Sequence, residues 1–367
     1  MWLYTRSLWD TPFSLQVGRQ RLSEDREWWW DQDLDAVRLH YDLRKLHLEF
    51  AAAQELGRVA SDAPHMDPEE EDVLRFLGHG TWEWRERNQL EVFFLHQRDR
   101  SSTELVGQRV KSSREDENDA DLTWAGLSAR GHWKLGRPGR LRYWVDTAVV
   151  DGRGKFLDYG GRTETRRVDA AFRHSVHGWA FDVGTTFETR LPGRPSFTLG
   201  YAVGSGDRRG KDLAKSDLQE ASDRSFRPTG LEDANGRFHG VNRFKYYGEL
   251  LEPDLSNLRI GTASIGFRLL RNSSLELVSH WYRQFQPAKF VRGATIRRQP
   301  AGRKHGLGRE FDLVLGIEEW EHVEIELIAS AFRAGPAFGL HTDPVDRVPS
   351  VEGEWSYLLG LKFELNF

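Results

Sequence analysis

The sequence predicts an all-β fold, a transmembrane antiparallel β-barrel that occupies residues 1–367 as a single domain. Three observations predict it: apolar and polar residues alternate with a period of two, short connections alternate with long polar ones, and aromatic residues accompany many charges. Outer-membrane barrels have aromatic girdles at both interfaces, a polar lumen and turns of unequal length on their two sides. We therefore expect the protein in the outer membrane, in contact with its lipid bilayer.

Composition narrows the function classes. The chain contains 14 Trp, 21 Phe and 9 Tyr beside 29% charged residues, and it has no cysteine. The net charge of -4 implies no general attraction to nucleic acid. No run of 18 apolar residues is present, which argues against a transmembrane helix. Neither a Gly-x-Ser-x-Gly elbow nor a His-Glu-x-x-His motif occurs. We expect no cofactor and no enzyme activity.

Alternation with a period of two marks the strands in order along the chain. Near the start, Leu46, Leu48 and Phe50 oppose His47 and Glu49. A helix would repeat every 3.6 residues, and these segments do not. We expect about fifteen strands, at residues 2–7, 13–20, 34–42, 45–53, 73–86, 88–98, 121–135, 139–150, 176–190, 194–204, 258–271, 274–286, 309–320, 322–333 and 353–367.

The last strand is the clearest of them. Its apolar face runs from Trp355 to Phe367, and the opposite face carries Lys362 and Glu364. The segment is longer than most strands of globular proteins. A terminal aromatic strand is common in barrel proteins, whereas an amphipathic strand of a soluble sandwich is the alternative interpretation.

Connections between the strands alternate in length. Long polar ones are expected near 54–72, 99–120, 151–175, 205–257, 287–308 and 334–352. The long side of a bacterial barrel is extracellular, so the chain would end in the periplasm and begin on the outer side. Because such barrels have an even number of strands, fifteen predicts that an odd number of N-terminal strands and a signal peptide are missing.

The polar face of the strands predicts a wet, charged lumen. Period two points the following residues inward: Arg38, Asp42, Glu49, Glu91, Arg142, Asp146, Asp182, Glu188, Glu324, Glu326, Lys362 and Glu364. Charges of both signs suit a channel for a polar polymer or solute. Acidic clusters near 67–72 and 115–121 are either calcium ligands or solvated loops.

Two alternative functions remain open. One is an outer-membrane enzyme that acts on lipid or protein at the rim, although the sequence shows no Ser-His-carboxylate pairing. The other is a structural or adhesive barrel whose lumen is plugged. In that case the long connection 205–257 would fold inward and close the channel.

Several segments resemble the alginate-export outer-membrane porins of pseudomonads. The first runs from Gly18 to Leu22 and continues through Asp31 to Ala36. Others follow in the same order, at 200–212, 230–232, 248–258 and 311–314. The resemblance extends over nearly the whole chain, but close identity is confined to these segments.

The resemblance implies a monomeric barrel of eighteen strands, three of them absent here, that passes an anionic exopolysaccharide outward by diffusion. It also implies loops that gate the channel, and periplasmic polysaccharide-synthesis and export proteins as partners. In that family an arginine-lined constriction attracts uronate carboxylates, with acids nearby. Guanidinium groups pair with carboxylates in a fixed geometry.

Six residues are the candidate substrate ligands. Arg21 and Arg243 match family arginines, Asp31 matches an acid, and Arg19 belongs to the same segment as Arg21. Arg38 and Lys362 complete the set as cations of the predicted inner face; Lys362 stands where the family has an acid. Glu252 and Glu326 stand where the family has basic residues. Alginate itself is therefore less secure than an anionic polysaccharide in general, and each arginine could instead brace the wall.

Overall fold

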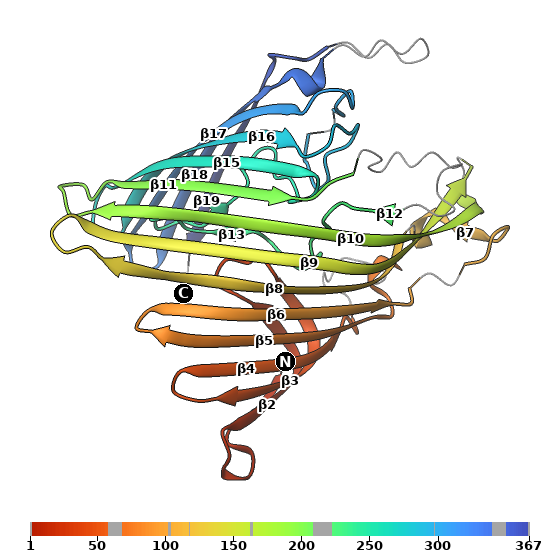
Figure 1. Ribbon diagram of the computed structural model, residues 1–367, viewed down its shortest axis with the longest axis horizontal. Helices are drawn as coiled ribbons and strands as arrows, with labels where there is room; N and C mark the ends of the chain where they lie inside the picture. Colours follow the sequence, from red (N-terminus) through yellow and green to blue (C-terminus); the bar gives the residue numbers. More distant parts are fainter. Residues whose placement is uncertain are drawn as a thin grey trace.

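The computed structural model describes residues 2–57, 68–101, 104–116, 118–161, 164–207, 222–296, 298–339 and 350–365. Within these residues, fifteen strands follow one another in a single antiparallel sheet (Figure 1). They are β1 (Trp2–Thr5), β2 (Phe13–Ser23), β3 (Asp31–Asp42), β4 (Leu46–Gln54), β5 (Val73–Arg85), β6 (Asn88–Asp99), β8 (Asn118–Lys134), β9 (Gly139–Gly160), β10 (Thr165–Thr189), β11 (Ser196–Gly204), β15 (Leu258–Arg268), β16 (Ser273–Gln284), β17 (Gly306–Trp320), β18 (Val323–Ala334) and β19 (Trp355–Leu365).

Shorter elements lie in the connections. They are the strands β7 (Arg109–Lys111), β12 (Ser222–Asp223), β13 (Asn235–Gly236) and β14 (Phe244–Lys245), and the 3₁₀ turns η1 (Leu8–Asp10), η2 (Pro68–Glu70), η3 (Ser112–Arg114) and η5 (Pro336–Phe338). No helix in the described part of the chain has the length and apolar character needed to cross a bilayer.

Each strand of the sheet pairs with the next one along the chain. In two places the next strand of the sheet is not the next element of the chain: β6 pairs with β8, past the short β7, and β11 pairs with β15, past the short β12, β13 and β14. Over the described residues, β1 pairs only with β2 and β19 only with β18. Short connections lie at the left of Figure 1, and the long ones at the right.

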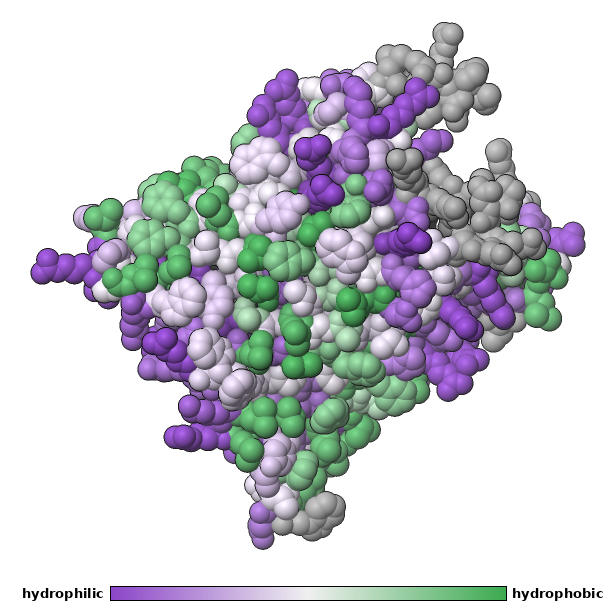
Figure 2. Space-filling view, viewed as in Figure 1, coloured by the Kyte–Doolittle hydropathy of each residue, from purple (hydrophilic) through white to green (hydrophobic). Residues whose placement is uncertain are grey.

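The two faces of the sheet differ as the alternation predicts. Large apolar side chains are exposed on the outer face, among them Val37, Phe50, Val92, Phe94, Leu127, Val149, Leu199, Leu277 and Leu359. Polar residues between them are buried on the inner face, among them Glu49, Glu91, Ser128, Asp146, Asp182, Thr198, Glu276 and Asp312. Figure 2 shows apolar side chains over the middle of the strands and hydrophilic ones toward the ends. This is the surface of an outer-membrane barrel.

The structure confirms the all-β barrel and its fifteen strands, with one correction. The expected loop 151–175 is wrong, because β9 and β10 continue as a paired hairpin up to Gly160 and Thr165. The alternation persists there, so Leu157 and Val168 are buried against Val110 of β7. Ladder hydrogen bonds and this small cluster support the extension. Position 67 of the first acidic cluster, position 117 of the second and the terminal residues 366 and 367 lie outside the described residues.

The hydrophobic core lies inside the sheet, because two connections fold inward. Residues 24–30, between β2 and β3, bring in Trp28, Trp29 and Trp30, all at least nine-tenths buried. Residues 222–257, between β11 and β15, add a second group of buried side chains: Phe226, Leu231, Phe238, Phe244, Tyr246, Tyr247, Leu250, Leu251 and Leu255. We call them the tryptophan loop and the inner loop. The described part of 205–257 thus lies within the barrel, as the plugged-barrel interpretation requires.

Candidate functional site

A buried arginine fastens the tryptophan loop to the wall. Arg26 forms ion pairs with Asp146 of β9 and, at 2.9 Å, with Asp182 of β10. Its guanidinium also lies over the rings of Trp144 and Tyr246, at 4.9 and 4.7 Å from their centroids. Two carboxylates and two aromatic faces offset the cost of burying this charge.

The same network holds the inner loop. The Tyr247 hydroxyl donates to Asp182 at 3.0 Å and accepts from the Trp28 indole at 2.6 Å. Four strands farther along the sheet, Glu310 of β17 accepts backbone N–H groups of Leu250 and Leu251 at 2.7 and 2.9 Å. Charge-assisted hydrogen bonds of this kind are stronger than neutral ones, so the two loops and the wall form one connected unit.

A basic cavity lies below this network, at the end of the barrel that carries the short turns. It encloses about 760 Å³. Six arginines line it, together with His132 and two acids, Glu24 and Asp25. The arginines are Arg26, Arg87, Arg130, Arg142, Arg237 and Arg243. Several of them have wall partners, as Arg142 has in Glu188 at 3.5 Å. Arg26, Arg130 and Arg243 likewise pair with buried carboxylates. The attraction of the cavity for anions therefore depends mainly on the exposed Arg87 and Arg237.

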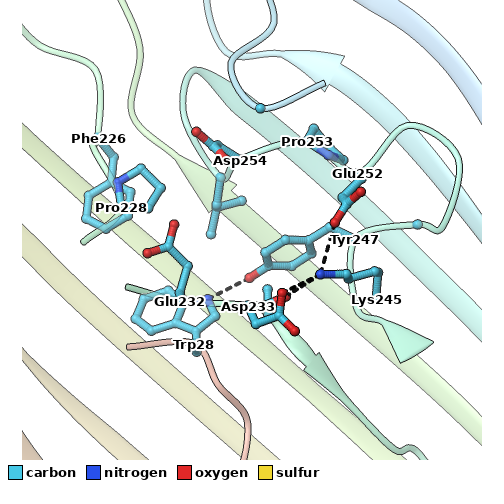
Figure 3. A pocket seen from close by; sticks show the side chains of 14 residues that line it. Trp28, Phe226, Pro228, Glu232, Asp233, Lys245, Tyr247, Glu252, Pro253 and Asp254 are labelled. Atoms are coloured by element: carbon cyan, nitrogen blue, oxygen red, sulfur yellow. Dashed lines mark hydrogen bonds and ion pairs between the residues drawn. The ribbon is translucent and has the colours of Figure 1, made fainter. Parts of the chain in front are cut away.

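A smaller, acidic pocket lies on the long-loop side of the network (Figure 3). It encloses about 170 Å³ between aromatic side chains, including Trp28 and Tyr247, and four carboxylates. The carboxylates belong to Glu232, Asp233, Glu252 and Asp254. Burial raises the pKa of the Glu232 carboxyl to about 7, and the nearby charge of Asp254 acts in the same direction.

A cluster of ion pairs connects the inner loop with the tryptophan loop and with the ends of β2 and β3 beside it. Arg21 pairs with Asp31, its Nε donating at 2.7 Å, and Arg243 pairs with Glu27. In both pairs the acid is buried and the cation is exposed: Asp31 and Glu27 keep 6% and 3% of their side-chain surface, Arg21 and Arg243 63% and 41%. Burial raises the pKa of Glu27 to about 7, while Arg243 opposes the shift.

Lys245 extends the cluster toward the acidic pocket. It pairs with Asp233 and, at 2.9 Å, with Glu252 (Figure 3). Glu252 therefore serves as a partner of a lysine at the position where the related porins were expected to carry an arginine. Glu27, Asp31 and Asp233 approach one another closely enough to share a ligand, but each already has its own cation.

The structure brings three of the six predicted ligands together and separates the others. Arg21, Asp31 and Arg243 meet in the cluster, and Arg243 also lines the basic cavity. Arg19 instead pairs with Asp35 at 3.2 Å. Arg19 and Arg21 alternate with the buried Gln20 and Leu22, so they begin on the outward face of β2, the side of the exposed Val17, and not on the lumen side.

Arg38 and Lys362 lie on the inner face, on β3 and β19. Arg38 pairs with Glu49 of β4 at 2.6 Å. Lys362 pairs with Glu364 at 2.8 Å, opposite Glu326 on β18, and keeps 65% of its side-chain surface. Arg38 also donates to the backbone carbonyl of Arg21 at 3.3 Å, whereas in the described residues the ion pair of Lys362 is with Glu364, outside the cluster. Whether any of the six binds substrate stays a prediction.

Sequence reasoning missed most of the basic cavity. The alternation could have assigned Arg130 to the inner face, because Arg130 follows Ala129 on β8 and pairs with the inward-pointing Glu91 of β6. Arg87 lies in a turn and Arg237 in the inner loop. Neither position has a strand periodicity that would have assigned it to a face.

Comparison with known proteins agrees with the fold. A family model described as alginate export matches residues 1–347. The chain is 24% identical over 361 residues to the alginate production protein AlgE of Pseudomonas aeruginosa, covering 94% of this chain and 70% of that protein. It is 23% identical over 327 residues to AlgE of Pseudomonas syringae pv. tomato, covering 83% and 62%.

One solved structure is similar over most of the chain. It is OccK5 (OpdH) of Pseudomonas aeruginosa, with a TM-score of 0.52 at 10% identity, covering 97% of this chain and 79% of that one. At this identity the likeness concerns the fold alone.

Proposed function

The chain belongs to the alginate export family and lies in the outer membrane, and we propose that it is a passive porin that exports an anionic exopolysaccharide such as alginate. It acts as a transport channel and catalyses no reaction. A monomer suffices, because the charged interior described above belongs to one chain. The periplasmic proteins that make and deliver the polymer are its partners in this proposal.

The basic cavity is the observation that carries the proposal. It is about 760 Å³ in volume, lies at the short-turn end and is lined by six arginines, four of which pair with buried carboxylates. The short-turn end of a bacterial barrel faces the periplasm, where an exported polymer arrives. A cationic entrance raises the local concentration of polyanions and speeds their capture.

Weak, reversible binding of the polymer's carboxylates explains how the polymer could move without sticking. Arg243, in the inner loop, keeps 41% of its side-chain surface exposed while its partner Glu27 is buried. A passing carboxylate can therefore bind the free edge of a guanidinium that is already neutralised by the protein. Each such contact is weak, and several weak sites in series permit both entry and release.

The inner loop makes this a gated porin in the proposal. Its contacts with Asp182 and Glu310 close much of the lumen, which also favours the plugged structural barrel as a second candidate function. The two candidates differ in whether the loop can yield to a polymer. The basic cavity favours the porin, since a purely structural plug has no need of exposed arginines such as Arg87 and Arg237 beside it.

Single-channel recording in planar bilayers tests the proposal with the full chain. We expect anion preference, and block by uronate oligomers added on the short-turn side. A neutral oligosaccharide of the same length should block far less. The variant Arg87→Gln/Arg237→Gln/Arg243→Gln should weaken uronate block at least tenfold. Arg100→Gln, an exposed arginine just after β6, is the matched control.

Two outcomes contradict the proposal. Equal block by neutral and anionic oligomers would remove the role of the arginines. A full-length protein that conducts no ions under any applied voltage would leave the plugged barrel as the better description.

A further inference from the structure

We propose that His40, His47 and Glu49 bind a divalent transition-metal ion such as Zn²⁺ on the inner face of the β3–β4 hairpin, with Asp42 orienting His47. The group lies beside the short turn that joins the two strands, apart from the basic cavity and the loop network. Its four residues are cross-strand partners, His40 opposite Glu49 and Asp42 opposite His47. Directly opposed residues of an antiparallel pair point to the same face.

Distances within the group suit a shared ion better than a hydrogen bond. His47 Nε2 and His40 Nδ1 lie 3.6 and 3.8 Å from the same carboxylate oxygen, Oε2 of Glu49. Both separations exceed those of ordinary hydrogen bonds. Two ligands of a tetrahedral ion with bonds of about 2.1 Å are separated by about 3.4 Å. The three candidate ligand atoms all lie within 4.8 Å of one another, so small side-chain rotations would complete the site.

Asp42 supplies the outer support that a histidine ligand needs. It lies 2.5 Å from His47 Nδ1. When that nitrogen donates its proton to the carboxylate, Nε2 carries the free lone pair and faces Glu49. Metal-binding histidines are commonly oriented by a carboxylate in this way, which also strengthens the ligand. The ring of His40 is held by the edge of Tyr4, with ring centroids 6.5 Å apart.

The charges of the site leave one net negative charge for a cation to offset. Arg38 donates to Glu49 Oε2 at 2.6 Å and neutralises one of the two carboxylates. A carboxylate has four lone-pair positions, so this hydrogen bond leaves room for a metal. Neutral imidazoles add no charge, and Asp42 remains as an unbalanced anion. Two nitrogen ligands and one oxygen ligand match the preferences of zinc, cobalt or nickel rather than calcium.

Exposure leaves one coordination position open. Glu49 and His40 are largely covered, at 5% and 12% of their side-chain surface, but His47 keeps 37%. Three protein ligands with a fourth position open to water is an arrangement known from catalytic zinc sites. Metal can therefore enter from the lumen without unfolding the hairpin.

Cobalt titration of the full chain in detergent micelles, after treatment with a chelator, tests the proposal. Co²⁺ in a site of low coordination number absorbs visible light, and Zn²⁺ should displace it and remove the absorption. We expect saturable binding by the wild type, and loss of the absorption in His40→Ala and His47→Ala. Asp42→Asn should weaken binding by about 10–100-fold, as expected for an outer-shell partner.

His177→Ala is the matched control, because His177 is a strand histidine that pairs with one carboxylate, that of Asp151, outside the proposed site. It should leave the titration unchanged. Wild-type protein without a saturable cobalt spectrum would overturn the proposal, and this result needs no variant to fold. Unchanged affinity in both His40→Ala and His47→Ala would overturn it as well. None of these outcomes depends on polymer transport.

Discussion

Replacing Arg26 with methionine should loosen both loops inside the barrel. Methionine keeps the length and apolar bulk of the side chain but removes the charge shared by Asp146 and Asp182. Two buried carboxylates would then lack their cation. The Trp144 and Tyr246 rings would also lose the guanidinium that lies over them.

The expected magnitude follows from the burial of the pair. Removal of one partner of a buried ion pair costs about 3–5 kcal/mol, because the remaining charge is left uncompensated. A loss at the upper end is expected here, since a single guanidinium serves both acids. The wall strands are held by their own ladders, so the cost should appear mainly as release of the loops. We expect larger and noisier single-channel currents, together with faster protease cleavage between 222 and 257.

A triple variant separates loss of the charge from loss of packing. In Arg26→Met/Asp146→Asn/Asp182→Asn no buried carboxylate remains unpaired, and such replacements can be nearly neutral. We expect it to recover most of the stability in guanidinium unfolding and the small conductance of the wild type. If Arg26→Met alone matches the wild type in both assays, Arg26 does not hold the loops and the reasoning fails.

Three further predictions concern the loop, its titration and the lipid face. Gly178→Ala places a methyl group 2.5 Å from the Cα of Phe226, and this overpacking should lower the free energy of unfolding in urea by about 1–3 kcal/mol. The control Gly360→Ala, with no atom within 4 Å of the added methyl group, should be neutral, and equal effects of the two variants would contradict the packing argument. The pKa of Glu232 is raised from 4.5 to about 7. Because the unfolded chain loses this proton at lower pH than the folded chain, stability should fall as pH rises from about 4.5 to 7. Glu232→Gln should flatten the pH dependence of the urea midpoint, and an unchanged pH dependence would refute this prediction. Leu359→Arg replaces an outer-face side chain that is 76% exposed with a charged one, which should cost about 2–4 kcal/mol near the bilayer midplane. The cost should appear as a lower urea midpoint in lipid vesicles, and an unchanged midpoint would place Leu359 outside the hydrocarbon.

The strands were predictable because their signal is local. Each segment alternates with a period of two, and thirteen of the fifteen expected strands are present within a few residues of their expected bounds; β9 and β10 extend ten and eleven residues farther. The error at 151–175 has the same origin. That stretch is polar enough to resemble a loop, and only its pairing with the neighbouring chain and with β7 reveals the extended hairpin.

The interior was less predictable because it depends on contacts between distant parts of the chain. Arg26 meets Asp146 and Asp182 across 120 and 156 positions, and Arg243 meets Glu27 across 216. No local pattern encodes such pairs. Family resemblance placed Arg21, Asp31 and Arg243 in one group, but it did not indicate that both inner connections would fill the lumen.

The opposite charges of the two cavities make the barrel electrically asymmetric along its axis. Arginines crowd the short-turn end, and carboxylates line the pocket nearer the long loops. A polyanion that enters among the arginines is attracted first and repelled last, whereas one approaching from outside meets the barrier before the attraction. A passive pore cannot change the equilibrium between the two compartments, but its ionic current should rectify. The sign of that rectification, read from a current–voltage curve under equal salt, reports the orientation of the fixed charges.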